Sequence, residues 1–265
     1  MQADHLPLEC PRSVSAPVDD AHPLRERLLA LMDQKDHWAW PAFTKAGLSK
    51  PQLLVHFRHE YQTYVRDFPV LLARALGQGP PSDVRAALAE NIFEEQTGKL
   101  SLGRSHPALF LEMMDGLGFK RDALETQTPP LETEAHAYRA FLDRISAASP
   151  WIVAVATLTI FVEGSVNERA ELMGQRKHAP MNEAIAAHPL VRFYGCPAEH
   201  MSLVRAHRAV ESGHRADAWR MVLSYTPRDG ELSETIVRTV ARALELWLAY
   251  RDGVVRAMGV APQSA

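Results

Sequence analysis

The sequence from Arg205 to Asp217 reads RAHRAVESGHRAD, and this stretch decides which fold we expect. If it is helical, His207, Glu211 and His214 stand at positions i, i+4 and i+7. With about 100° of rotation per residue, their side chains fall within roughly 60° of one another on one helix face. Imidazole and carboxylate groups one turn apart can converge on a metal ion. His and Glu are also common on solvent-facing helices, so a metal site needs partners from other helices.

The composition is that of an ordinary globular protein. Hydrophobic residues make up 46% of the 265 residues and charged residues 23%. A formal net charge of −3 gives no reason to expect nucleic acid or an anionic membrane as a partner. The two cysteines, Cys10 and Cys196, form neither a disulfide framework nor a Cys-type zinc site. A reducing cytoplasm is therefore the compartment that we expect. We also expect the chain to form a homodimer.

The N-terminal residues 1–23 are rich in Pro, Ser and Asp and lack the pattern of a secretory signal. We expect them to form a flexible tail, followed by one domain over residues 24–265. The most apolar run, Trp151 to Val162, is too short to span a bilayer and is typical of a buried core helix.

Helical periodicity runs through the whole chain, and no alternating strand pattern is convincing. Ser49 is expected to cap one helix and Ser82 another, and Pro69 should kink the first of these. The fold class that we predict is an all-α, single-domain bundle of about seven to nine helices. The main helices are expected at 24–35, 49–76, 82–98, 106–118, 132–148, 150–173, 197–225 and 232–258, with short pieces at 38–47 and near 181.

Glu163 is the most informative single residue, because it follows the apolar run WIVAVATLTIFV. A buried carboxylate is costly unless it is paired, protonated or bound to a metal. The alternative is an acid at a helix end that reaches solvent, since Gly164 and Ser165 follow.

Two further candidates lie in the first half of the chain. Glu95 shares a helix face with Asn91, although its neighbour Glu94 stays open as an alternative, and His106 opens the next helix. The candidate ligand set contains three imidazoles and three carboxylates and no thiolate. Such a set suits iron or manganese, and it is large enough for two metal ions. Its members are Glu95, His106, Glu163, His207, Glu211 and His214.

Taken together, these motifs resemble the haem-oxygenase-like di-iron oxidases. The resemblance rests on NIFEE at 91–95, His106-Pro107, Glu163 and H-x3-E-x2-H at 207–214, and it covers residues 24–258. Each motif alone is weak, and the specificity lies in their joint spacing. Thiaminase-II-like and pyrroloquinoline-quinone-synthase-like proteins belong to the same superfamily.

The resemblance implies a helical bundle around two Fe2+ ions, with Mn as an alternative, and O2 as co-substrate. It also implies N-oxygenation or oxidative carbon–carbon cleavage of a small, amino-acid-derived substrate in a biosynthetic pathway, with Glu163 bridging the metals. One departure is Glu211, where the family usually has Asp. His200 lies on the same stripe, but the family pattern is complete without it, so we do not expect it to be a ligand.

Three alternatives stay open. A thiaminase-like enzyme needs a nucleophilic cysteine, and Cys196, beside Pro197, is more typical of an inert thiol. A metal-independent oxidase of the quinone-synthase type would not need the carboxylates. A non-catalytic helical binding protein would carry its histidines incidentally. Aromatic residues that could line a cavity, although core packing explains each more simply, are Tyr61, Tyr64, Phe68, Phe161, Phe193 and Tyr194.

Overall fold

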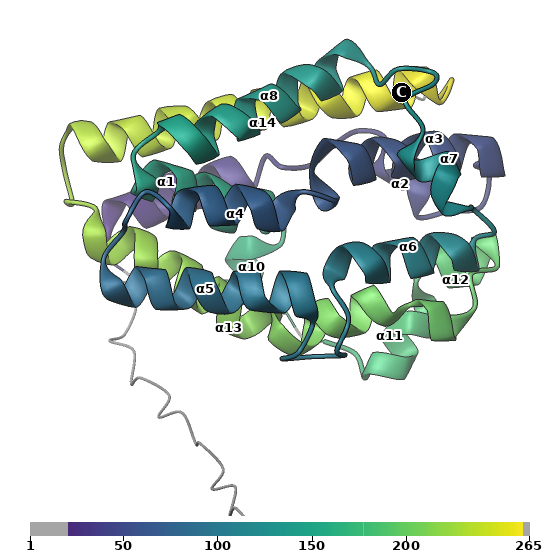
Figure 1. Ribbon diagram of the computed structural model, residues 1–265, viewed down its shortest axis with the longest axis horizontal. Helices are drawn as coiled ribbons and strands as arrows, with labels where there is room; N and C mark the ends of the chain where they lie inside the picture. Colours follow the sequence, from purple (N-terminus) through teal and green to yellow (C-terminus); the bar gives the residue numbers. More distant parts are fainter. Residues whose placement is uncertain (1–20, 177, 262–265) are drawn as a thin grey trace, which may run out of the picture.

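The computed structural model describes residues 21–176 and 178–261, except for the side chains of residues 210–212, and the regular elements of this part are all helical (Figure 1). The predicted all-α class is confirmed. Fourteen α-helices are present in the described residues, more than expected, because long segments are divided and short helices occupy the connections. Their bounds are α1 (Pro23–Met32), α2 (Trp40–Phe43), α3 (Lys50–Glu60), α4 (Phe68–Leu76), α5 (Ser82–Thr97), α6 (His106–Gly116), α7 (Arg121–Glu125), α8 (Thr133–Ala148), α9 (Trp151–Val155), α10 (Glu168–Leu172), α11 (Met181–Ala187), α12 (Pro189–Tyr194), α13 (Ser202–Tyr225) and α14 (Glu231–Ala257).

Three further segments have other helical windings: the π-helices η1 (Tyr61–Val65) and η2 (Ala156–Val162), and the 3₁₀-helix η3 (Ala198–His200). The helix expected over 49–76 is thus divided. Ser49 caps α3 as predicted, through a capping box with Gln52. The chain then widens into η1 and turns at Asp67 before Pro69, which lacks a backbone donor.

Two predicted helix starts were wrong. Ser82 is the first residue of α5 rather than its cap, which is Pro81. The helix predicted over 197–225 begins only at Ser202, because η3 and Met201 precede it. His200 therefore does not share the α13 face that carries His207 and His214.

The helix predicted over 150–173 is also shorter than expected. It winds as α9 and then as η2, and Glu163 is the residue that ends it. The hydroxyls of Thr157 and Thr159 donate to the carbonyls of Val153 and Val155, at 2.8 and 2.9 Å. These bonds satisfy carbonyls in the stretch where the backbone changes to the wider winding. α10 follows as a separate helix.

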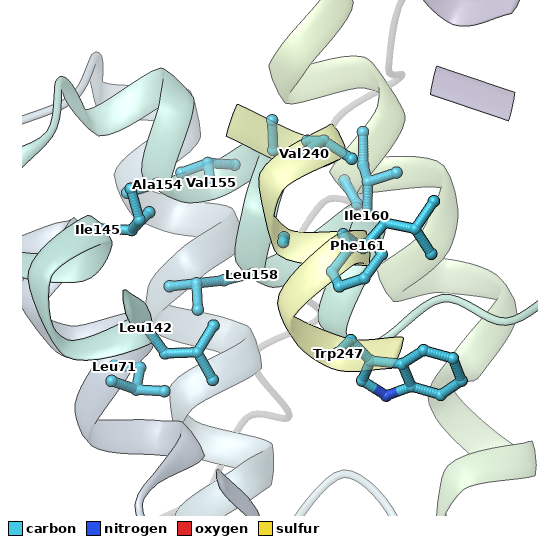
Figure 2. Packing of buried hydrophobic residues seen from close by; sticks show 14 of the residues in the cluster. Leu71, Leu142, Ile145, Ala154, Val155, Leu158, Ile160, Phe161, Val240 and Trp247 are labelled. Atoms are coloured by element: carbon cyan, nitrogen blue, oxygen red, sulfur yellow. The ribbon is translucent and has the colours of Figure 1, made fainter. Parts of the chain in front are cut away.

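The helices enclose two clusters of buried apolar side chains. In the larger cluster, α14 packs along α8 and α1, while α4 packs between α5 and α8 (Figure 1). Figure 2 shows Leu71 of α4, Leu142 of α8 and Leu158 of η2 close together, with Phe161 of η2 beside Ile160. The smaller cluster joins α3, α6, α7 and the start of α13 and includes Phe110 and Leu203.

The N-terminus of the described chain is fixed to the bundle. The buried ring of His22 caps α1 and lies 3.0 Å, through Nε2, from the carbonyl of Thr226 beyond α13. Residues 1–20 of the predicted tail, including Cys10, lie outside the described residues. Within the described part, no helix is both long and apolar enough to cross a membrane.

Candidate metal centre

A cavity of about 210 Å³ lies where the two apolar clusters meet. Phe68 lines it from the larger cluster, and Phe110 and Leu203 line it from the smaller one. Both π-helices contribute to its wall, η1 through Tyr64 and Val65 and η2 through Thr159 and Val162. Five of the six candidate ligands predicted from the sequence line this cavity: Glu95, His106, Glu163, His207 and His214.

Glu95, His106 and His207 form the tightest group in the cavity. Each offers one ligand atom, and these three atoms lie within 4.8 Å of one another. The rings of His106 and His207 meet edge to face, with centroids 4.8 Å apart. His106 Nδ1 is buried and lies 2.7 Å from Glu95 Oε1, but it makes no hydrogen bond of normal geometry within the described residues. An imidazole nitrogen facing a carboxylate in this way is arranged as a metal ligand would be.

Glu94 has a different role from its neighbour. Its carboxylate is fully buried and accepts hydrogen bonds from the Ser101 hydroxyl and, at 2.7 Å, from the Leu100 backbone amide. It also lies 3.3 Å from His106 Nε2. A carboxylate on the second ring nitrogen fixes the orientation of a ligating histidine, so Glu94 holds the ring while Glu95 faces the cavity.

The loop between α5 and α6 brings these groups together. Gly98 ends α5 with φ of 61°, in the left-handed region. A Cβ atom at this position would collide with the backbone of Arg104, where the loop folds back. The close approach places His106, at the start of α6, beside the last turn of α5.

Glu163 points into the cavity rather than out to solvent. Its Oε1 accepts a hydrogen bond of 2.9 Å from Asn91 Nδ2. Burial among protein atoms raises the pKa of the Glu163 carboxyl to about 8, and the negative charge of Glu95 acts in the same direction. More than a third of its surface is nevertheless accessible, because it faces the cavity.

α13 supplies two histidines that line the cavity, His207 and His214. Burial lowers the pKa of His207 to about 4, and the neighbouring His106 adds to this effect. Burial also lowers the pKa of His214. Both rings are therefore neutral at pH 7, the state in which imidazole binds a metal. Glu211 lies between them on α13, but its side chain is outside the described residues.

Sequence reasoning missed Glu168, which is buried at the first turn of α10 and also lines the cavity. Its Oε1 accepts a hydrogen bond of 2.8 Å from Trp219 Nε1, and its Oε2 accepts one of 3.1 Å from Arg215 Nε. One feature of the sequence pointed to a buried acid: Arg215 and Trp219 stand at i and i+4 on α13, so both can contact the same partner. The partner of that pair could not be read from the sequence.

Two other candidates lie away from the cavity. The Cys196 thiol is buried against Met113 and Met201, and burial raises its pKa to about 11. It is therefore protonated at pH 7, and Cys196 does not line the cavity that contains the candidate ligands. His200 places Nδ1 2.9 Å from the carbonyl of Glu112 and packs closely against Gly116. Of the predicted aromatic residues, Tyr64 and Phe68 line the cavity.

The donors in the cavity fit an iron centre. They are nitrogen and oxygen atoms from α5, α6, α13 and the end of η2, and one buried ring nitrogen among them has no normal hydrogen bond to any described residue. The model of a family of iron-containing redox enzymes matches residues 55–248. The chain belongs to this family. The match spans the chain from α3 into α14 and so includes all six candidate ligands.

The fold is similar to that of a solved structure. A TenA homolog from Pseudomonas syringae pv. tomato superposes with a TM-score of 0.60, covers 90% of each chain and is 15% identical in sequence. At this identity the likeness shows the fold alone. Together with the family match, this fold confirms the resemblance to the haem-oxygenase-like superfamily. No curated protein matches the chain.

Proposed function

We propose that this chain binds two iron ions and uses O2 to oxidise a small, amino-acid-derived substrate. The observation that carries the proposal is the convergence of Glu95, His106 and His207 in one cavity of a chain from an iron-containing redox family. Glu163 and His214 line the same cavity, and Glu211 follows His207 by one helical turn.

The chain's own residues would hold and orient the metals. Neutral His207 and His214 would bind from α13, and His106 through Nδ1 while Glu94 holds the other side of its ring. Asn91 orients Glu163 through its amide group. Iron in a site of carboxylates and imidazoles supplies the redox chemistry with O2.

The rest of the cavity would hold the substrate. Its walls are mostly apolar, through Phe68, Phe110, Val162 and Leu203, and they would exclude bulk water from the reacting atoms. A volume of about 210 Å³ suits a compact molecule rather than a polymer. The buried Glu168–Arg215 pair supplies charged groups in the wall, which suits a substrate that bears ionised groups.

Anaerobic loading with Fe(II) tests the proposal. The chain should take up iron, and exposure to O2 should then produce a visible absorbance change with consumption of O2, which a panel of amino acids should increase. His106→Ala and His207→Ala should each lose most of the bound iron, because they remove ligand atoms. Absence of iron uptake, or iron uptake without any reaction with O2, would contradict the proposal.

His200→Ala is the matched control. His200 precedes α13 and contacts the Glu112 carbonyl on α6, but it does not line the cavity. Its removal should leave iron stoichiometry close to that of the wild type. A marked loss of iron in this variant would place the centre elsewhere.

A further inference from the structure

Tyr64 lies between the candidate metal centre and a second cavity. This second cavity has a volume of about 250 Å³ and is lined by Lys35, Trp40, Glu60 and Trp247, among others. Tyr64, Val162 and Gly164 line both cavities. The Tyr64 side chain thus forms part of the wall of both cavities. The candidate ligands line the first cavity, and charged and aromatic groups line the second.

The hydroxyl of Tyr64 points to a carboxylate. It donates a hydrogen bond of 3.2 Å to Glu60 Oε1, which also accepts one of 2.7 Å from Arg251 Nη1. Burial by itself would raise the pKa of Glu60, but the charge of Arg251 and the hydrogen bonds from Arg251 and Tyr64 lower it. His56 also favours the ionised Glu60 when it is protonated, but burial lowers its own pKa to about 3, so it is neutral at pH 7. Burial and the Glu60 charge raise the pKa of Tyr64. The pair is therefore a protonated phenol beside a carboxylate that can accept its proton.

Aromatic side chains continue from Tyr64 towards the surface. Tyr64 meets Tyr138 and Tyr250 edge to face, each at 6.4 Å between centroids, and these two rings stack at 5.6 Å. The Arg251 guanidinium follows, 5.6 Å from the Tyr250 centroid and 4.3 Å from that of Trp40. Trp40 also lies 6.1 Å from Trp247 and is partly exposed, so the series ends at solvent. These spacings are those of rings in direct contact.

We propose that Tyr64 is a one-electron donor to the iron centre and that Glu60 accepts its proton; this rests on the proposed function. The O–H bond of Tyr64 breaks, and its proton passes to Glu60 Oε1. One electron from the phenol lowers the oxidation state of the O2-oxidised iron by one. A neutral tyrosyl radical remains. An external one-electron reductant, such as ascorbate, returns an electron to the Tyr64 radical through Trp40, Tyr250 and Tyr138. The proton then returns from Glu60 to the phenol.

The experiment uses the full chain, loaded with Fe(II) without oxygen, exposed to O2 and frozen for electron paramagnetic resonance. The wild type should show a tyrosyl radical whose signal narrows when ring-deuterated tyrosine is incorporated. Tyr64→Phe should lose this signal while binding the same amount of iron. Tyr194→Phe is the control, because the Tyr194 hydroxyl donates to the Lys45 carbonyl and the ring lines neither cavity. It should keep the full signal.

A second variant tests the path without removing the phenol. Trp40→Phe should form the same radical as the wild type but return to the diamagnetic state more slowly when ascorbate is added. Iron that oxidises without any tyrosyl radical, or an unchanged radical in Tyr64→Phe, overturns this inference alone. Failure of the wild type to bind iron or to react with O2 overturns the proposed function as well.

Discussion

The carboxyl group of Glu163 shows how a single residue couples the cavity to pH. Its pKa of about 8 in the metal-free protein means that it is mostly protonated at pH 7, whereas a metal ligand must be ionised. His207 needs no such change, since its pKa of about 4 leaves the ring neutral. His106, like Glu163, must lose a proton before it binds a metal. Burial lowers the pKa of His106, but the charges of Glu95 and Glu94 outweigh burial and raise it.

We expect the apparent affinity for Fe(II) to rise with pH up to about 8, where the Glu163 carboxyl has lost its proton. This group alone contributes up to about tenfold per pH unit below that point. Anaerobic calorimetry at several pH values measures the affinity and the protons released. Glu163→Gln should bind more weakly and show a shallower pH dependence, whereas the exposed Glu199→Gln should behave as the wild type. An equally steep dependence in Glu163→Gln would contradict this assignment.

The raised pKa of Glu163 has the opposite effect on the metal-free fold. The affinity for iron rises with pH, whereas the stability of the metal-free fold falls. The Glu163 pKa is raised from 4.5 to about 8, so between these values the folded chain holds a proton that the unfolded chain has released. Its contribution to the stability of the metal-free protein is therefore present below pH 4.5 and is lost as the pH rises towards 8. Because the group faces a cavity that water can enter, the loss is smaller than for a group sealed in the core.

Glu211 leads to a prediction about the second metal. It stands where the resembled family usually has Asp, and its extra methylene leaves more rotamers to restrict on binding. We expect protein purified in air to hold one metal ion or less per chain, and to gain the second only with added Fe(II). Glu211→Asp should keep or tighten the weaker site. Glu211→Ala should weaken it by about tenfold or more and largely keep the other site. Full loading of both sites without added iron would rule this out.

At the scale of the elements, the end of η2 depends on a residue far away in sequence. Lys35, just after α1, is buried, and its Nζ donates to the carbonyls of Phe161, Val162 and Gly164 at 2.5, 3.2 and 2.6 Å. These carbonyls flank Glu163. Burial lowers the pKa of Lys35 to about 7, so its amino group is only partly charged at neutral pH. The Lys35 amino group thus caps the helix that positions the candidate bridging carboxylate.

Lys35→Met should lower the free energy of unfolding by about 1.5–3 kcal/mol, because three hydrogen bonds to the carbonyls at the helix end are lost. It should also weaken Fe(II) binding by about tenfold, since the carboxylate loses its support. Urea unfolding and anaerobic Fe(II) titration measure the two effects. Lys45→Met, at an exposed lysine, is the control and should change neither. A destabilised variant with unchanged iron affinity would limit Lys35 to a structural role.

The α5–α6 connection offers a prediction with a matched control in the same loop. Gly98→Ala should cost about 1–3 kcal/mol in backbone strain, because φ is 61°, and more through the clash with Arg104. It should also lower iron binding, since the loop places His106 beside Glu95. Gly103→Ala has the same kind of strain, with φ of 73°, but its Cβ would meet nothing within 4 Å. Equal iron content in both variants would show that the loop does not control the centre.

At the scale of the whole molecule, the candidate centre lies in a cavity that is lined by residues of both apolar clusters. A ligand that binds only the folded chain stabilises it by mass action. Free Fe(II) at about one hundred times its dissociation constant should add about 2.7 kcal/mol, which raises the Tm by about 5–10 °C in a chain of this size. Anaerobic calorimetric melting measures the rise, and a chelator should reverse it. His200→Ala should show the full rise, and a similar full rise in His207→Ala would contradict the assignment.

The homodimer stays a prediction, which sedimentation can test.

Local features of this protein could be predicted from the sequence alone. The capping of α3 by Ser49, the end of α5 at Gly98 and the span of α14 depend on a few neighbouring residues and on helical geometry. The spacing of His207 and His214 placed both rings on one face of α13 for the same reason. The choice of Glu163 as an inward-facing acid followed from the apolar run before it. The ligand roles themselves stay predictions.

Contacts between distant segments could be decided only by the tertiary structure. Glu94 contacts His106 Nε2 and Glu95 faces the cavity, and this difference depends on how the loop folds back at Gly98. The wide winding of η2 and its cap by Lys35 depend on the packing of α1 against the rest of the bundle. The positions of Glu168 and Tyr64 in the cavity wall arise from pairs of segments far apart in sequence. Such proximity is set by the packing of whole helices, which no periodicity within one segment encodes.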